Sequence, residues 1–234
     1  MRIVTNTAIS LDGRIATARY DHVAIGTPSD RAYMSVLRSQ ADAVLVGGRT
    51  FRNWPLPLVP DQAAIAGLAR AGFPGLSPNL VSPGPREWWL NVVLSRELDV
   101  PRTGRFYTDP RVRPLFFSPS SRPMPAEVVV GEVSPNHVVD ELERRGVQTL
   151  LIEAGGALIH DFLAAERDGR PLVDELYVTL CPLVIGGVGA PSLVDGAGFT
   201  AATMRHLDLV SHIQWGDELF LRYATRPANP GTRC

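Results

Sequence analysis

Short runs of apolar and β-branched residues alternate with helix-like segments along most of this chain, and this alternation narrows its fold more than any other feature. Strand-like runs occupy residues 2–10, 42–46, 88–95, 113–117, 126–130, 149–153 and 172–184. Segments with helix signals occupy residues 27–41, 62–71, 134–146 and 155–166. Strands separated by helices tend to pair in parallel, and a parallel sheet needs helices on both faces. The sequence therefore predicts an α/β fold of three layers.

The end of the chain departs from this alternation. Residues 207–223 read as two strands joined at Gly216–Asp217, which is typical of an antiparallel hairpin. The sheet is therefore expected to be mixed but mostly parallel. Residues 53–87 are rich in proline and glycine, yet strand patterns resume on both sides, so we interpret them as a surface excursion. We predict one domain over residues 1–225 and a disordered tail over 226–234.

Two helices carry recognisable boundary signals. Thr27, followed by Pro28 and Ser29, is expected to begin the helix of residues 27–41. Asn136 is a candidate cap for the helix of residues 134–146, and Gly146 is expected to end it.

Composition excludes several classes of protein. The net charge of −1 gives no long-range attraction to nucleic acid or to anionic membranes. The chain has no lysine, so Schiff-base chemistry is excluded and arginine must hold any anion. Its cysteines, Cys181 and Cys234, form neither a disulfide framework nor a metal cluster, and the histidines lack metal-ligand spacing. The N-terminus lacks a signal-peptide core, and no apolar run approaches the roughly 20 residues of a membrane span. A cytoplasmic protein without a metal site is predicted.

Three strand ends carry groups that bind anions. Gly47-Gly48 is followed by Arg49 and Thr50, Ser95-Arg96 follows another strand, and Gly155-Gly156 separates a strand from a helix. Bare glycine amides and a helix N-terminus attract phosphate, although each corner alone is also compatible with ordinary turn chemistry. Because open α/β sheets bind ligands at the carboxyl ends of their strands, we expect the three corners to grip one phosphate-bearing ligand. No G-x-G-x-x-G follows the first strand, and a Walker lysine is impossible, so the two commonest nucleotide-binding folds are disfavoured.

These corners resemble known motifs. "GGRTF…PLP", "NVVLS-R" and "GGALIHDFL" resemble the segments that clasp NADPH in the dihydrofolate-reductase-like superfamily. Within it, the chain is more similar to the pyrimidine reductase of riboflavin biosynthesis, the C-terminal part of the bacterial bifunctional deaminase-reductase. The matching stretches are "SLDGRIA" (10–16), "LRSQADAVLVGGRT" (37–50), "LIEAGGALI" (151–159), "LVDELYVTLCPLVIGG" (172–187) and "APSLVDGAGF" (190–199). No zinc-deaminase signature accompanies them.

The resemblance implies a dihydrofolate-reductase-like fold with a nine-stranded sheet, NADPH as hydride donor and a homodimer. The implied reaction converts the ribosylamino group of a pyrimidine 5′-phosphate into the ribitylamino form. Implied cofactor-binding residues are Gly48, Arg49, Thr50, Ser95, Arg96, Gly155, Gly156, Ala157 and Leu158. Implied substrate-binding residues are Asn6, Asp12, His22, Arg38, Leu58 and Glu153.

The proton that must accompany the hydride has more than one possible source. Asp30 resembles the acidic residue that begins the first helix of dihydrofolate reductases, and Glu153 matches a substrate-contacting position. Asp30 and Glu153 are therefore the candidate catalytic residues, with bound water as a further source. The alternative for Asp30 is that its carboxylate satisfies free amides at the helix start.

The chain also departs from the reductase pattern. Trp54 stands where the family carries an acidic residue, and Asp61 stands near the place of a substrate-contacting base. An acid there would repel a substrate phosphate. Two alternatives stay open: an NADPH reductase of another substrate, such as dihydrofolate or a small carbonyl or imine compound, and a non-catalytic nucleotide-binding dimer.

Overall fold

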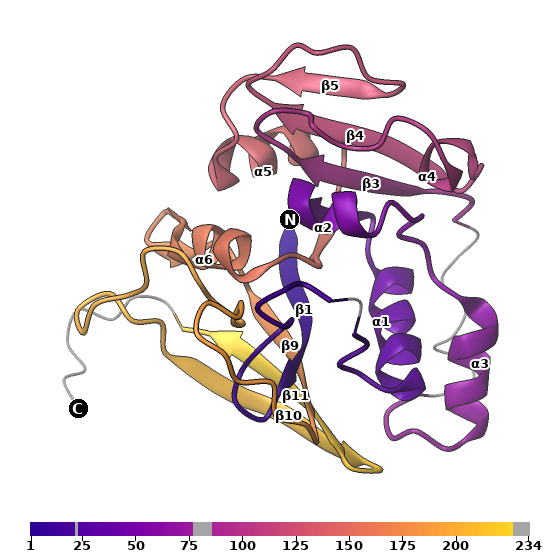
Figure 1. The fold of residues 1–234 in the computed structure, drawn as a ribbon, viewed down its shortest axis with the longest axis vertical. Coiled ribbons are helices and arrows are strands. Elements are labelled where there is room, and N and C mark those ends of the chain that lie inside the picture. The colour runs from indigo at the N-terminus through magenta and orange to yellow at the C-terminus, as the bar shows by residue number, and fades with distance from the viewer. Residues whose placement is uncertain (22, 77–85, 227–234) are drawn as a thin grey trace.

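The computed structural model describes residues 1–21, 23–76 and 86–226. Its main feature is a nine-stranded sheet in the order β10-β11-β9-β1-β6-β2-β3-β4-β5 (Figure 1). The strands are β1 (Arg2–Ser10), β2 (Ala43–Gly47), β3 (Trp89–Leu94), β4 (Val112–Ser118), β5 (Glu127–Val130), β6 (Thr149–Ile152), β9 (Glu175–Cys181), β10 (Leu207–Trp215) and β11 (Glu218–Thr225). All neighbours pair in parallel except β10 with β11 and β11 with β9. The predicted mixed, mostly parallel sheet with a C-terminal hairpin is confirmed.

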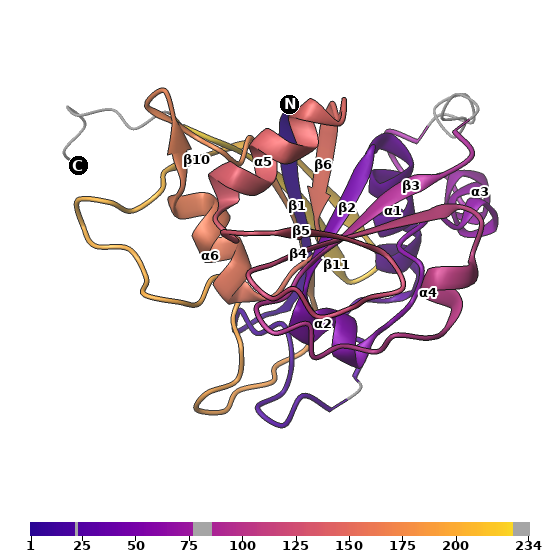
Figure 2. The same cartoon turned by 90° about the horizontal axis from the view of Figure 1, so that it is seen from above.

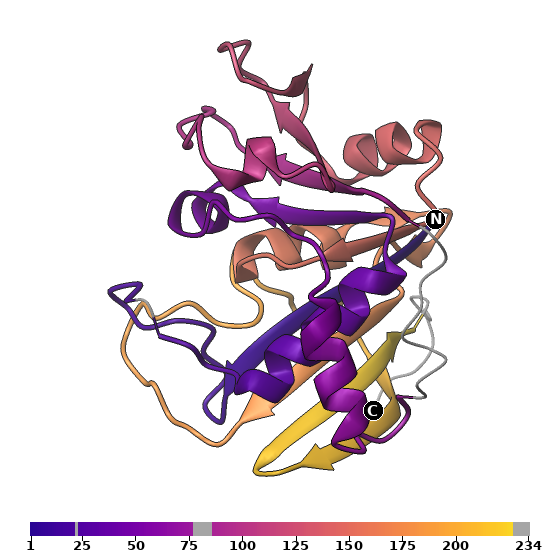
Figure 3. The ribbon, with the colours of Figure 1, turned by 90° about the vertical axis from the view of Figure 1, so that its right-hand side faces the viewer.

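Helices cover both faces of this sheet. α1 (Pro28–Gln40) and α3 (Gln62–Arg70) lie on one side, and α5 (Pro135–Arg144) and α6 (Gly156–Ala164) lie on the other (Figure 2). Figure 3 shows α1 and α3 running across the sheet side by side. Helices on both faces explain why Ala43–Val46 of β2 and Leu150–Ile152 of β6 are apolar at successive positions, because each side chain of such a strand faces a covered surface.

The period of two along the strands divides the core into two layers. In β2, Ala43 and Leu45 pack with α5 and α6, whereas Val44 and Val46 face the side of α1. In β6, Leu150 and Ile152 join the first layer and Leu151 joins the second. A third cluster, around Phe73 and Phe220, joins α3 to the terminal hairpin.

Several details differ from the sequence-based expectation. Two short helices, α2 (Gly48–Asn53) and α4 (Arg105–Thr108), and the two-residue strands β7 (Glu166–Arg167) and β8 (Arg170–Pro171) were not predicted. The predicted cap Asn136 is wrong: Ser134 caps α5, and its hydroxyl accepts the His137 amide at 3.4 Å. Pro135 explains this, because proline favours the first helical position and so makes its predecessor the cap. Of the predicted tail, residues 227–234 lie outside the described residues.

Three neighbouring strands bring the expected corners together. β6, β2 and β3 are adjacent and parallel, with Leu45 opposite Ile152 and Gly47 opposite Leu94. Their carboxyl ends therefore lie at one edge of the sheet. α2 follows β2 there, α6 follows β6, and Ser95 follows β3.

Candidate active site

A cavity of about 840 Å³ opens at this edge of the sheet. All three glycine or arginine corners contribute to its wall, together with β1 and the loop of residues 11–27. The corner residues that line it are Gly47, Gly48, Arg49, Thr50, Ser95, Arg96, Gly155, Gly156, Ala157 and Leu158. Segments separated by about a hundred residues in the chain thus form a single concave surface.

The paired glycines of this wall serve different purposes. A Cβ built on Gly155 meets nothing within 4 Å, so this residue borders open space. A Cβ on Gly156 would lie 2.3 Å from the Ser192 carbonyl oxygen, and one on Gly48 would lie 2.9 Å from Ser95 Oγ. The lack of a side chain at Gly156 and Gly48 therefore lets their backbone pack closely against Ser192 and Ser95, whereas Gly155 leaves room for a ligand.

The start of α6 suits an anion. Gly155 is its N-cap, and no side chain of the described residues caps the helix there. The first amides of a helix lack intrahelical partners, and the helix dipole is positive at this end. The open face of Gly155 and these amides together form a surface onto which a phosphate group fits.

Two exposed guanidinium groups flank this surface. Arg49 donates to the Tyr20 hydroxyl at 2.6 Å, and its guanidinium lies 5.2 Å from the centre of the Tyr20 ring. Arg96 follows β3 on the cavity wall and is exposed. Ser95 is less available than expected, because it is buried beneath Gly48 and its hydroxyl accepts the Leu98 amide at 3.2 Å. Thr50 lines the cavity and is half-buried.

The interior of the cavity carries two buried polar side chains. Asp30 of α1 is 8% exposed and Asn6 of β1 is 7% exposed. Burial raises the pKa of Asp30 to about 6; a hydrogen bond from Thr179 opposes this rise, and the negative charge of Glu218 adds to it. The side-chain amide group of Asn6 has no hydrogen-bond partner among the residues that the structure describes. A buried amide without a partner at a cavity wall is suited to a ligand that both donates and accepts hydrogen bonds.

Glu153 and Arg38 form a bidentate ion pair. Arg38 Nε donates to Glu153 Oε1 at 2.8 Å, and Nη2 donates to Oε2 at 2.6 Å. Burial alone would lower the pKa of Arg38, but the charge and hydrogen bonds of Glu153 outweigh burial and raise it. Glu153 reaches the cavity wall, whereas Arg38 lies behind it. Arg38 is thus placed to hold the Glu153 carboxylate, and its charge is already neutralised.

Two other expected substrate residues, Asp12 and Leu58, lie elsewhere. Asp12 accepts the Ile185 and Gly186 amides at 3.0 and 2.7 Å, which ties its turn to the loop after β9. The Ile185 amide and the Ser10 hydroxyl lower the pKa of Asp12 to about 2. Leu58 is buried in the core, with its amide bound to Asn91 Oδ1 at 2.7 Å. Neither Asp12 nor Leu58 lines the cavity, and His22 lies outside the described residues.

Comparison with known proteins identifies the family. The sequence profile of the RibD C-terminal domain matches residues 2–221. The chain belongs to the RibD C-terminal domain family. It is 31% identical over 206 residues to the riboflavin biosynthesis protein RibD of Synechocystis, covering 84% of this chain and 49% of that protein. It is 27% identical to the 2,5-diamino-6-ribosylamino-4(3H)-pyrimidinone 5′-phosphate reductase of Methanothermobacter thermautotrophicus, covering 96% of this chain and 98% of that one.

Solved structures share the fold of this RibD C-terminal domain. RibD of Acinetobacter baumannii matches with a TM-score of 0.71 at 21% identity, covering 96% of this chain and 58% of that one. A pyrimidine reductase-like protein from Corynebacterium diphtheriae also gives 0.71, at 20% identity, covering 96% of this chain and 92% of that one. The chain therefore spans about half of the long RibD proteins and nearly all of the shorter relatives.

Asp61 and Trp54, the two departures from the family pattern, lie in different surroundings. Asp61 is the N-cap of α3, where its carboxylate accepts the Ala63 and Ala64 amides at 3.0 and 3.1 Å. It does not line the cavity, so it does not face a ligand there. Trp54 ends α2, lines the cavity and is 48% exposed.

Sequence reasoning missed part of the cavity wall. Tyr20, Gly26 and Arg31 come from the loop before α1 and from α1 itself, and Asp195 comes from the loop after β9. Tyr20 has a φ of 56°, an uncommon conformation for a non-glycine residue. No strand-end or glycine signal marks these positions. Only the position of Arg31, immediately after the candidate acid Asp30, gave a hint.

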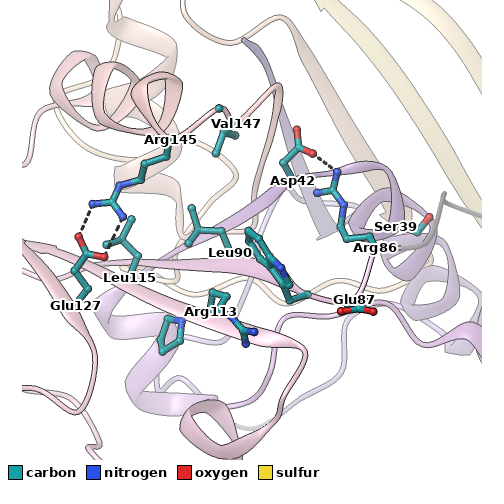
Figure 4. Close-up of a pocket in the computed structure, with 13 residues that line it drawn as sticks. Ser39, Asp42, Arg86, Glu87, Leu90, Arg113, Leu115, Glu127, Arg145 and Val147 are labelled. Carbon is teal, nitrogen blue, oxygen red and sulfur yellow. Dashed lines mark hydrogen bonds and ion pairs between the residues drawn. The ribbon is translucent and has the colours of Figure 1, made fainter.

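A second cavity, of about 1070 Å³, lies at the opposite ends of the strands (Figure 4). Two of its three arginines form ion pairs. Arg86 binds Asp42, and Arg145 binds Glu127 through Nη1 to Oε2 at 3.0 Å, on either side of Leu90, Leu115 and Val147. The third, Arg113, donates to the Pro110 and Val112 carbonyl oxygens at 3.0 and 3.2 Å. Guanidinium groups engaged in this way offer little to an anion, so we place the candidate active site in the first cavity.

Across residues 1–21, 23–76 and 86–226, no group of three or more metal-ligating side chains gathers. Among the same residues, no helix has the length and apolarity to cross a membrane.

Proposed function

We propose that this chain is an NADPH-dependent reductase of riboflavin biosynthesis, which reduces the ribosylamino group of an aminated pyrimidine 5′-phosphate to the ribitylamino form. The observation that carries the proposal is the union, in one cavity, of the three strand-end corners with the buried Asp30 and Asn6. The names of the full-length relatives from Methanothermobacter and Archaeoglobus support the choice of substrate. The cavity volume, about 840 Å³, falls in the upper part of the roughly 300–1,000 Å³ range of ligand sites.

The fit of the coenzyme rests on the corner at Gly155. We assign its pyrophosphate to the uncapped amides of α6 beside the open face of Gly155, with Ala157 and Leu158 following. Thr50 is assigned to a phosphate oxygen. Arg49 and Arg96 are assigned to the 2′-phosphate, since charge-assisted hydrogen bonds from guanidinium groups bind a dianion strongly. When bound, the reduced nicotinamide supplies the hydride.

The substrate occupies the inner end of the cavity in this proposal. Asn6 pairs with an edge of the pyrimidine ring, because its free amide offers both a donor and an acceptor. Arg38 cannot be the phosphate ligand while Glu153 holds both sides of its guanidinium. Arg31 is exposed on the cavity wall and makes no ion pair with another described residue, so we assign the substrate phosphate to Arg31.

The proton is assigned to Asp30. Addition of hydride to a carbon–nitrogen double bond leaves negative charge on nitrogen, which must be protonated. Glu153 accepts two hydrogen bonds from Arg38, so it suits an orienting role. With a pKa of about 6, Asp30 carries a proton over part of the physiological pH range and regains one from water after each transfer.

We further propose a homodimer. β10 forms an edge of the sheet, and its exposed face includes Leu209 and Val210, which are 52% and 47% exposed. Edge strands with apolar side chains are favourable surfaces for pairing with a second copy. Light scattering of the wild-type chain and of a Val210→Lys variant tests this directly.

Trp54 favours one alternative. An exposed indole at the position of the family's acidic residue provides a flat apolar surface, which would suit dihydrofolate or another aromatic substrate. Oxidation of NADPH should therefore be followed with the ribosylaminopyrimidine phosphate and, separately, with dihydrofolate. Turnover of the first alone supports the proposal, and turnover of dihydrofolate alone replaces it. Tight NADPH binding by calorimetry without turnover of either would point to a non-catalytic nucleotide-binding protein.

A further inference from the structure

The start of α1 carries the sequence of a capping box but does not form one. In Thr27-Pro28-Ser29-Asp30, the cap residue is followed three positions later by an acid, which ordinarily reaches back to the cap amide. Here the Thr27 hydroxyl oxygen accepts the Ser29 amide at 3.1 Å, as a cap should. The Thr27 amide, however, does not bind Asp30.

Glu218 takes the place of Asp30 in the cap. The Thr27 amide donates to Glu218 Oε1 at 2.8 Å, and the Thr27 hydroxyl donates to Oε2 at 2.6 Å. Glu218 begins β11, directly after the hairpin turn, and is 1% exposed. A carboxylate this deeply buried is costly unless it is hydrogen-bonded, and the Thr27 amide and hydroxyl supply that compensation.

Asp30 is consequently directed into the cavity. Asp30 lines the cavity together with Gly26 of the loop before α1. A Cβ built on Gly26 would lie 2.0 Å from Asp30 Oδ2, so the backbone there approaches as closely as glycine permits.

We propose that Glu218 is a positioning residue, which occupies the cap of α1 and thereby keeps the Asp30 carboxyl group in the cavity as the proton donor. The inference rests on the proposed function only in assigning proton transfer to Asp30. The placement of the two carboxyl groups stands on the contacts with Thr27 and Gly26.

The charges around Asp30 agree with this role. Burial is the largest influence on the pKa of Asp30, and Glu218 from β11 and Glu153 from the end of β6 also raise it. The Thr179 hydrogen bond and the Arg31 charge lower it. Cys181 of β9 faces both acids, and burial raises the pKa of its thiol to about 12, so it is neutral. Its sulfur lies 3.6 Å from Glu218 Oε1, where the thiol donates.

Two variants separate charge from geometry. Glu218→Gln keeps a group of the same shape that still binds Thr27, but it removes the negative charge near Asp30. Glu218→Ala leaves the Thr27 amide without a partner, so Asp30 is expected to turn back and cap the helix. Glu127→Gln, an exposed acid that lines the second cavity, is the matched control for loss of one negative charge.

The first readout needs no turnover. Carbon-13 NMR of labelled aspartate carboxyl groups, with Asp30 assigned by Asp30→Asn, gives the pKa of Asp30 directly. We expect Glu218→Gln to lower it by roughly half to one pH unit, the scale of shifts from a nearby like charge. Glu127→Gln should leave it unchanged. A pKa of Asp30 that is the same in Glu218→Gln and in wild type overturns the proposal.

The second readout is kinetic and structural. In Glu218→Ala, kcat should fall about 10²-fold or more, within the 10²–10⁴ range of general acid catalysis, while KM and NADPH affinity change little. Its crystal structure should show the Asp30 carboxylate bound to the Thr27 amide, and an unmoved Asp30 contradicts the inference. If wild type turns over no pyrimidine phosphate while the NMR shift is found, the proposed function fails and the positioning of Asp30 stands.

Discussion

The ion pair of Arg38 and Glu153 gives the sharpest test of the site's architecture. Its side chains are 13% and 10% exposed, so solvent screens the interaction little. Replacing Arg38 by Met keeps much of the side-chain volume but leaves the Glu153 carboxylate buried without a counter-charge. The Trp89 indole bond to the Arg38 carbonyl involves backbone and survives the change.

Two independent estimates give the magnitude. Each of the two charge-assisted hydrogen bonds contributes about 1.5–3 kcal/mol. Breaking a buried pair by removing one partner typically costs about 3–5 kcal/mol. We therefore expect Arg38→Met to lower the free energy of unfolding by roughly 3–5 kcal/mol. The double variant Arg38→Met/Glu153→Leu should recover a large part of this loss, because neither charge then remains.

The assay is urea denaturation followed by circular dichroism. Arg38→Met, Glu153→Leu and the double variant are compared with wild type in one double-mutant cycle. Arg226→Met is the control, since its pair with Asp208 has side chains 54% and 53% exposed. Such exposed pairs contribute little to stability, because solvent screens the two charges. A loss in Arg38→Met no larger than that of the control would show that Glu153 does not depend on Arg38.

Four further variants give predictions, three of them in the cavity and one at the cap of α3. Gly155→Val should abolish NADPH binding in calorimetry without lowering stability, because the new side chain enters open space, whereas Gly67→Val in α3 should leave binding intact. Asp30→Asn should stabilise the protein at pH 8 by up to about 3 kcal/mol and have little effect at pH 4. The pKa of Asp30 in the folded protein is raised to about 6. The stability contributed by the protonated Asp30 side chain is therefore present at low pH and is lost as pH rises through that value. We expect kcat/KM of the wild type to fall as pH rises through about 6, and the same variant should remove that fall; an unchanged profile would exclude Asp30 as the donor. Replacing Arg49 and Arg96 together by Ala should lower the preference for NADPH over NADH by about 10–100-fold, measured as the ratio of kcat/KM values. Asp61→Ala should cost about 1 kcal/mol of stability through loss of the α3 cap and leave the substrate KM unchanged, whereas a lower KM would place Asp61 against the substrate.

Local patterns in the sequence were sufficient to predict the sheet and the glycine or arginine corners at its strand ends. The unbroken apolar run Ala43-Val44-Leu45-Val46 indicates a strand with both faces covered, and the glycine pair after it marks its end. Parallel pairing then requires such ends to gather at one edge, whatever the order of the strands. The helix α2 was missed because six residues opening on a glycine give too short a pattern to recognise.

Contacts distant in sequence were beyond that kind of reasoning. Arg38 and Glu153 are 115 residues apart, and nothing in either neighbourhood indicates that each neutralises the other. Asp61 is a different case, because an aspartate directly before an alanine-rich helix is an ordinary capping signal. The family pattern predicted a substrate contact at this position, whereas the residues that follow Asp61 indicate a helix cap.

The hydrogen bonds between Thr27 and Glu218 also have a consequence for how the protein matures. They join positions 191 residues apart, so they form only when the final hairpin has been synthesised and docked on β9. The three strand-end corners, by contrast, need only β2, β3 and β6, which precede β11 in the chain. During synthesis the cavity wall at these corners therefore becomes available before Glu218 exists to bind Thr27, and the environment of Asp30 is completed only by β11.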